Sequence, residues 1–240
     1  MDDINTIAKR HGIHIVEDAA QAIGARHDGA ALGGIGRFGA LSFHTTKNVI
    51  AGEAGALIVR DPADVERAEI VREKGTDRTR FKRGLVDKYT WQDIGSSFLP
   101  SEVTAAFLWA QLPHTYMITK TRLELWRGYQ NAFADLESGG QVMRPGVPDT
   151  AAHNAHLYYL LFKDEKVRKN VEAQLRAKGV GTATHYVPLH TAPAGKHFGR
   201  SESSLEVTDR TAGRLLRLPL YPDLTVEQQE HVIRCVQDEF

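Results

Sequence analysis

The stretch Val16-Glu17-Asp18-Ala19-Ala20-Gln21 closes the short apolar run Ile13–Val16, and Ser42-Phe43-His44-Thr45-Thr46-Lys47-Asn48 closes the run Ala40–Phe43. Short apolar runs of this kind are typical of buried strands in a parallel sheet. A carboxylate, Asp18, and an amine, Lys47, therefore each stand where a strand gives way to a loop. Proteins with α/β sheets place their ligands at such strand ends.

The segments that follow indicate an α/β layer. Ala56–Val59 is a third strand candidate, and Asp61-Pro62 begins a helix that is expected to end near Lys74. The strand at Ile13–Val16 is expected to be buried on both faces, which requires neighbours on each side. Few strands remain before residue 100 to supply them, so the large domain is expected to be incomplete at its N-terminal end.

The middle of the chain contains two predicted helices behind a long polar loop at 75–94. Ser101 is expected to cap the first helix, with Trp109 on its buried face, and Pro113 to end it. The second helix is expected over Thr115–Leu136. We therefore divide the chain into the remainder of a large domain at 1–112, a connecting helix at 113–138 and a small C-terminal α/β domain at 139–240.

The last hundred residues show their own alternation of strands and helices. Strands are predicted at His156–Phe162 and Thr182–Val187, on either side of a helix at Asp164–Lys178. Thr225 and Gln228 have the spacing of a capping box at the start of a final helix.

Composition excludes several classes of protein. Thirty basic residues balance thirty acidic ones, which gives no electrostatic case for binding nucleic acid or an anionic membrane. No apolar run approaches the roughly 20 residues that span a bilayer.

Cys235 is the only cysteine, so no internal disulfide can form. It lies in the apolar pattern of the last helix and is expected to pack in the core. With an acidic N-terminus that lacks a signal-peptide profile, the chain is expected to be cytoplasmic.

Two motifs point elsewhere and are rejected. Gly34–Gly39 matches G-x-G-x-x-G, but a polar stretch precedes it and a strand-like run follows, whereas a dinucleotide site needs a strand before and a helix after. These glycines are interpreted as turn residues. Among the eleven histidines, His185 and His190 flank Pro188, which argues against regular ligand spacing, and no metal is predicted.

Taken singly, the two polar residues have ordinary explanations. Asp18 could cap a nearby backbone amide, and Lys47 could be a solvated surface lysine. Together they are an amine that can form a Schiff base and a carboxylate that can hold a pyridine nitrogen protonated. Those are the two groups that a pyridoxal 5′-phosphate (PLP) enzyme needs from its protein. Ser42 adds a hydroxyl suited to a phosphate.

The runs V-E-D-A-A-Q, S-F-H-x-T-K-N and G-E-x-G resemble those of the DegT/DnrJ/EryC1/StrS sugar aminotransferases, and within them the dTDP-4-amino-4,6-dideoxygalactose transaminases. The resemblance continues to the C-terminus through R-E-K-G-T, D-K-Y-T-W, D-I-G-S-S, W-A-Q-L, H-Y-V-P-L-H and R-L-P-L. It implies the aspartate aminotransferase-like fold, PLP fold type I. Family members also carry a stretch before this start, with a Gly-Thr segment that binds the cofactor phosphate.

The resemblance also implies roles for individual residues. Lys47 is expected to bond covalently to PLP and Asp18 to pair with its pyridine nitrogen. Gln21 is expected near the phenolic oxygen and Ser42 at the phosphate. Ser97 stands where the family often has an Asn that reaches over from the partner subunit, which makes a homodimer the expected assembly. Lys47 also separates this chain from the family's dehydratases, which have His there.

The implied reaction moves an amino group from glutamate to the C4 ketone of dTDP-4-dehydro-6-deoxyglucose, giving dTDP-4-amino-4,6-dideoxygalactose. Two alternatives stay open. One is an aminotransferase for another nucleotide keto sugar. The other is a truncated or split fragment that is not catalytic by itself.

Overall fold

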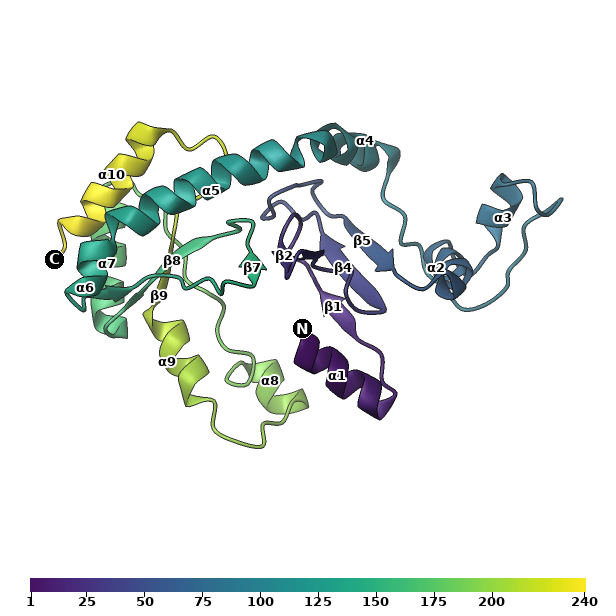
Figure 1. The fold of residues 1–240 in the computed structure, drawn as a ribbon, viewed down its shortest axis with the longest axis horizontal. Helices are drawn as coiled ribbons and strands as arrows, with labels where there is room; N and C mark the ends of the chain where they lie inside the picture. The colour runs from purple at the N-terminus through teal and green to yellow at the C-terminus, as the bar shows by residue number, and fades with distance from the viewer. The chain divides into compact units, whose positions relative to one another are not determined.

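The computed structural model describes residues 1–240 and divides into two compact units (Figure 1). The large unit comprises residues 1–119 and 148–154, and the small unit comprises 120–147 and 155–240. The domain limits at 112 and 138 that the sequence indicates stay predictions. None of the helices combines the length and apolarity needed to span a bilayer.

A three-stranded sheet forms the centre of the large unit, in the order β1 (Val16–Asp18), β4 (Phe38–Ser42), β5 (Gly55–Val59). β1 runs parallel to β4 with Asp18 opposite Ala40, and β5 runs antiparallel to β4 with Gly55 opposite Ser42. The carboxyl ends of β1 and β4 therefore lie on one edge of the sheet, as the sequence predicts for Asp18 and Ser42.

The prediction for the first strand needs a correction. Ile13–Ile15 lie outside β1, and the Val16 side chain is 65% exposed instead of buried. The reason is that β1 is the outermost strand of the sheet and pairs with β4 on one side only, which leaves Val16 accessible to solvent.

A second small sheet brings a distant segment into the large unit. Its strands are β3 (Ala30–Ala31), β2 (Arg26–His27) and β7 (Ala151–Ala152), all antiparallel. The pairing of β2 with β7 holds residues 148–154 against the start of the chain.

The helices of the large unit are α1 (Asp2–His11), η1 (Pro62–Asp64), α2 (Val65–Arg72), α3 (Arg78–Lys82), α4 (Glu102–Gln111) and η2 (Leu112–His114), and α5 (Thr115–Ala132) continues into the small unit. Ser101 caps α4 as predicted, because its Oγ accepts the Thr104 N–H at 3.1 Å.

Two predictions for this part of the chain were wrong. The polar segment 75–94 contains a short helix, α3, and Trp109 is 74% exposed instead of buried.

The small unit is built on an antiparallel sheet in the order β6 (Val142–Met143), β8 (Tyr158–Phe162), β9 (Leu215–Leu218). Its further helices are α6 (Ala134–Ser138), α7 (Glu165–Ala177), α8 (Pro193–Phe198), α9 (Glu206–Arg214) and α10 (Val226–Gln237). The capping box at Thr225 and Gln228 is confirmed, with both of its hydrogen bonds present. The strand predicted at Thr182–Val187 is reduced to one bridge between Ala183 and Arg217.

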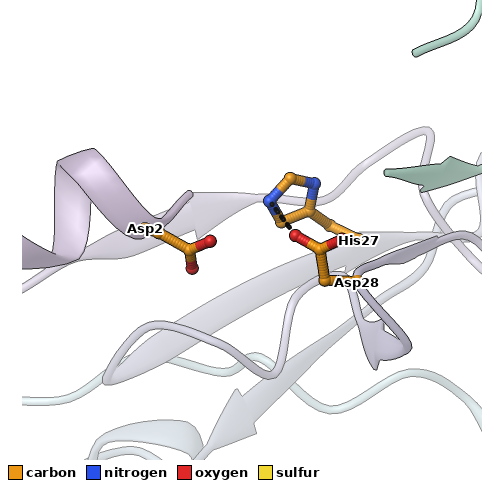
Figure 2. Close-up of side chains that lie close together, drawn as sticks. All are labelled: Asp2, His27 and Asp28. Atoms are coloured by element: carbon orange, nitrogen blue, oxygen red, sulfur yellow. Dashed lines mark ion pairs between the residues drawn. The ribbon is translucent and has the colours of Figure 1, made fainter. Parts of the chain in front are cut away.

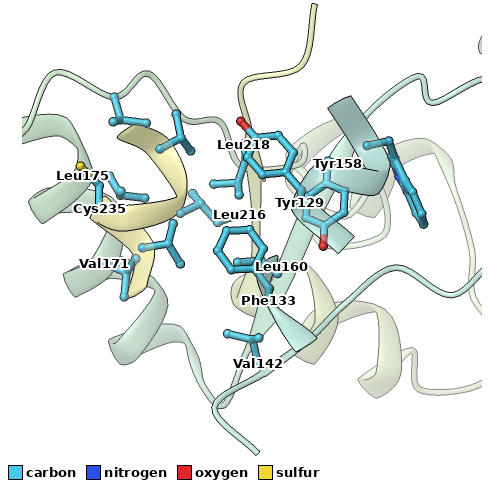
Figure 3. Packing of buried hydrophobic residues seen from close by; sticks show 14 of the residues in the cluster. Tyr129, Phe133, Val142, Tyr158, Leu160, Val171, Leu175, Leu216, Leu218 and Cys235 are labelled. Atoms are coloured by element: carbon cyan, nitrogen blue, oxygen red, sulfur yellow. The ribbon is translucent and has the colours of Figure 1, made fainter. Parts of the chain in front are cut away.

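Buried apolar side chains fill the space between this sheet and its helices (Figure 3). Tyr129 of α5 and Phe133, which follows this helix, stack 5.9 Å apart, centroid to centroid, and Tyr129 lies 5.0 Å from Tyr158 of β8. Leu160 on the same strand is completely buried, and Cys235 of α10 is buried as predicted. The small unit thus has a core of its own.

Removing one side chain from this core should measurably destabilise the protein. We expect Leu160→Ala to lower the free energy of unfolding by about 2–5 kcal/mol, because it leaves a cavity in a fully packed site. Leu189→Ala makes the same chemical change at a side chain that is 82% exposed, and we expect a loss below about 0.5 kcal/mol. Chemical denaturation followed by circular dichroism measures both. Equal losses would show that this cluster is not the core.

Candidate functional site

The site begins at the shared edge of β1 and β4. Asp18, the last residue of β1, is exposed, and its Oδ1 accepts the Ala20 N–H at 3.1 Å. Oδ2 has no partner. The small Ala19 is buried, and its N–H donates to the Ala40 carbonyl at 2.9 Å, which extends the pairing with β4 by one bond. The edge therefore presents one free carboxylate oxygen above a small, closely packed residue.

Lys47 lies on the loop that joins β4 to β5. Backbone bonds close this loop: Phe43 N–H donates to Ala54 O at 2.8 Å, and Thr45 N–H donates to Gly52 O at 3.1 Å. A turn at its tip is made by Lys47 N–H and His44 O, 2.9 Å apart. The half-buried Lys47 amine has no hydrogen-bond or ion-pair partner in the structure. The amine is therefore accessible to a ligand that enters beside this loop.

The residues after Lys47 fix the loop to the body of the large unit. Gln111 at the end of α4 holds Ile50 through both of its amide atoms: Nε2 donates to Ile50 O at 2.6 Å, and Oε1 accepts from Ile50 N–H at 3.1 Å. Val49 next to it is completely buried in a cluster with Phe43 and Ala51. The lysine loop is thus anchored on its C-terminal side.

Asn154 connects this loop to the loop after β1. Its Nδ2 donates to Gln21 O at 2.8 Å and to Ile23 O at 2.9 Å. Its own carbonyl accepts from Asn48 Nδ2 at 2.9 Å. One buried residue, 4% exposed, therefore ties the neighbours of Asp18 to the neighbour of Lys47. Nothing in the sequence marked Asn154 for this role, because it lies more than a hundred residues from its partners.

Glu17 is a second residue that the sequence did not single out. Its carboxylate is buried and accepts three backbone N–H groups, those of Gly33 at 2.8 Å and of Ile35 and Gly36 at 2.6 Å each. Converging N–H groups of this kind form an anion-binding nest. Here the nest holds the protein's own carboxylate. The sequence signal that could have indicated a buried role for Glu17 is its position directly after the apolar run Ile13–Val16.

This nest explains the glycines of the rejected G-x-G-x-x-G motif. A strand, β4, follows them instead of a helix, as the sequence predicts. A Cβ on Gly36 would stand 2.8 Å from Ile15 O, and one on Gly39 would stand 1.9 Å from Gly33 O. These glycines therefore allow backbone segments to approach each other closely. The N–H groups that would bind a phosphate already donate to Glu17.

The remaining predicted site residues are divided between two places. Ser42 ends β4 on the Asp18 edge, and its Oγ accepts the His44 N–H at 3.3 Å. Gln21 lies in the exposed loop after β1 that Asn154 holds. Ser97 is not on this edge. It is an exposed residue that bridges to Glu73, just beyond α2.

One cluster outside the edge has metal-ligating side chains. Asp2, His27 and Asp28 bring three potential ligand atoms within 4.8 Å of one another (Figure 2). His27 Nε2 already pairs with Asp28 Oδ2 at 3.3 Å and lies 3.4 Å from the amino group of Met1. An ion pair on an exposed turn accounts for this geometry, and we assign no metal to it.

The residues at the edge fit PLP. A carboxylate oxygen without a partner can accept from a pyridinium N–H, a free amine can bond to an aldehyde, and a hydroxyl can donate to a phosphate. Asp18 offers the carboxylate and Ser42 the hydroxyl at the carboxyl ends of β1 and β4, and Lys47 offers the amine on the loop that leaves β4.

Comparison with known proteins agrees with this chemistry. Residues 1–237 match the DegT/DnrJ/EryC1/StrS aminotransferase family. The chain belongs to this family. Its members are PLP-dependent aminotransferases of fold type I, and the mixed α/β structure described above has that fold.

Individual members resemble the chain over nearly its whole length. The dTDP-3-amino-3,4,6-trideoxy-alpha-D-glucose transaminase of Streptomyces venezuelae is 34% identical over 99% of this chain and 59% of its own length. Erythromycin biosynthesis sensory transduction protein EryC1 of Saccharopolyspora erythraea is 33% identical over 99% of this chain and 61% of its own. The crystal structure of S. venezuelae DesV in complex with a ketimine intermediate superposes with a TM-score of 0.86 at 32% identity, covering 99% of this chain and 61% of DesV.

The chain thus spans about 60% of the length of the members that it matches. Activity, substrates and assembly of the whole protein are taken up as proposals below.

Loss of the Asn154 side chain should loosen the loop after β1. We expect Asn154→Ala to lower the free energy of unfolding by about 1–3 kcal/mol, because two part-buried carbonyls lose their donor. Hydrogen exchange of residues 19–25 should become faster, while exchange in the small unit's sheet stays unchanged. The exposed Asn170→Ala is the control. Unchanged exchange at residues 19–25 would contradict this role for Asn154.

Proposed function

We propose that this chain provides the cofactor-binding lysine and the small domain of a PLP-dependent nucleotide-sugar aminotransferase. The observation that carries the proposal is that Asp18 ends β1, while Lys47 lies on the loop that leaves the carboxyl end of the neighbouring parallel strand β4. The reaction proposed moves an amino group from glutamate to the C4 ketone of dTDP-4-dehydro-6-deoxyglucose and gives dTDP-4-amino-4,6-dideoxygalactose. Membership of the sugar aminotransferase family supports the reaction class.

When bound, PLP supplies an electron sink for the charge that develops at a carbon losing its proton. The protein's part is to position groups around that chemistry. The Asp18 carboxylate, whose Oδ1 is bonded to Ala20 N–H, would use its other oxygen to hold a proton on the pyridine nitrogen. The Lys47 amine would carry a proton to and from the reacting carbon, a form of help typically worth about 10²–10⁴-fold.

Three further residues bind and orient in this proposal. Ser42 donates its hydroxyl to the cofactor phosphate, and Gln21 lies beside the phenolic oxygen. Ser97 of the partner subunit completes the phosphate contacts in a homodimer. The exposure of Ser97 on a segment away from the Asp18 edge supports a role across a subunit interface. We place the protein in the cytoplasm, where a chain with one cysteine needs no disulfide.

A second position of amination has a specific observation in its favour. The S. venezuelae relative at 34% identity is named for a 3-amino sugar, so a nucleotide sugar with a C3 ketone is the alternative substrate. Amination assays on matched 3-keto and 4-keto nucleotide sugars separate the two. Preference for the 4-keto sugar supports our assignment, and preference for the 3-keto sugar overturns it while leaving the aminotransferase class intact.

The reactive lysine can be tested without turnover. We expect borohydride reduction of the 240-residue chain in excess PLP to attach a pyridoxyl group to Lys47, because that amine has no competing partner. Tryptic mass spectrometry locates the modified residue. In Lys47→Ala the main adduct should disappear, whereas Lys9→Ala, a change at an exposed lysine of α1, should leave it intact. An adduct that survives Lys47→Ala would rule out the assignment.

Retention of the cofactor should be weak in the isolated chain. β1 has a neighbour on one side only, and the relatives contain roughly two-thirds more chain, so part of the pocket around PLP is expected from polypeptide outside these residues. We expect gel filtration to strip most PLP from the loaded chain, measured by visible absorbance. Tight, stoichiometric retention would show instead that these 240 residues form a complete cofactor site.

A further inference from the structure

A cavity of about 290 Å³ lies in the small unit, where the segment 181–183 runs against β9. Its lining includes Arg217 of β9, Pro219 just beyond it, His156 before β8 and Thr182. This volume is close to the lower limit for pockets that hold small ligands. None of the predicted cofactor residues belongs to it.

Arg217 is the charged residue of this cavity, and its guanidinium is only partly bonded. One terminal nitrogen, Nη2, donates to Thr184 O at 2.9 Å. Nε is buried and has no hydrogen-bond partner. No carboxylate forms an ion pair with Arg217. A buried donor on a cation normally has a partner, because leaving it without one costs about 1–3 kcal/mol or more.

The other inward-facing arginines of the small unit are satisfied. Arg122 is buried and donates to Ala155 O at 2.9 Å and to His156 O at 2.6 Å. Arg144 pairs with Glu137 at 2.6 Å, and Arg168 pairs with Glu172. Arg217 is the exception, and it is also the one that lines a cavity.

The surroundings of Arg217 leave it as a cation without a counter-ion. The pKa of His185 is lowered by partial burial of its ring and by the positive charge of Arg217. The lowered pKa disfavours a second positive charge beside Arg217, and a histidine ring cannot serve as its counter-ion. The backbone of Arg217 is held by two bonds to Ala183, at 2.7 and 3.2 Å, so the side chain projects from a fixed strand.

We propose that the cavity beside Arg217 binds an oxyanion group of a substrate. A planar guanidinium matches two oxygens of a carboxylate or a phosphate, and Thr182 adds a hydroxyl to the lining. The identity of the ligand rests on the proposed function, which offers two oxyanion sources: the carboxylates of glutamate and the diphosphate of the nucleotide sugar.

Direct binding tests this site without any need for catalysis. Isothermal titration calorimetry of the 240-residue chain is carried out with glutamate and, separately, with inorganic pyrophosphate. We expect at least one of them to bind, and Arg217→Gln to weaken its binding about tenfold or more, because a charge-assisted bond is lost. Arg217→Lys keeps the positive charge but lacks the paired N–H donors of a guanidinium, and should weaken binding less than Arg217→Gln does. Arg210→Gln removes an equal charge from an exposed position of α9 and should leave binding unchanged.

The two ligands distinguish the sources. Binding of glutamate alone assigns the cavity to the amino donor, binding of pyrophosphate alone assigns it to the nucleotide, and binding of both supports a general oxyanion site. Absence of binding by both overturns the proposal, as does an equal effect of Arg217→Gln and Arg210→Gln in variants with wild-type circular dichroism. If Lys47 traps no PLP while Arg217-dependent binding persists, the proposed reaction fails and the oxyanion site stands.

Discussion

The buried carboxylate of Glu17 is the interaction on which the geometry of the candidate site depends. Three N–H groups of the segment just before β4 converge on it from one side of β1. This pins the entry into β4 beside β1 and sets the register that puts Asp18 opposite Ala40. Hydrogen bonds to a charged acceptor contribute about 1.5–3 kcal/mol each, so a register slip would lose more than a single contact.

Once that register is set, the lysine is placed by what β4 leads into. Ser42 ends the strand opposite Gly55, and the connecting loop must carry Lys47 close to the same edge. Loops lack the regular pairing of strands, and here two side chains supply hydrogen bonds in its place. Gln111 bonds to the backbone of Ile50 in the Lys47 loop, and Asn154 bonds to backbone carbonyls in the loop after β1. Polar residues thus fix the loop that carries Lys47, while the Lys47 amine itself has no partner.

The two units differ in how completely their apolar surfaces are covered. The small unit has a closed core in which Tyr129, Tyr158 and Leu160 are completely buried. In the large unit, Val16 and Leu57 remain more than half exposed on the outer strands of a three-stranded sheet. This contrast agrees with a chain that matches its relatives over about 60% of their length. Within the small unit, Arg217 is the one arginine with a buried nitrogen that has no hydrogen-bond partner.

Local patterns in the sequence determined the features that depend on neighbouring residues. Ser101 and Thr225 were identified as caps because a cap needs only the next few N–H groups. Asp18, Ser42 and Lys47 were identified because they stand at, or a few residues beyond, the ends of two apolar runs. Family membership followed from the same motifs. Only the tertiary structure showed the roles of Glu17, Asn154 and Arg217, and the exposure of Val16 and Trp109. These depend on partners from remote parts of the chain, or on the lack of such partners, and no local spacing encodes which distant backbone groups come within hydrogen-bonding distance.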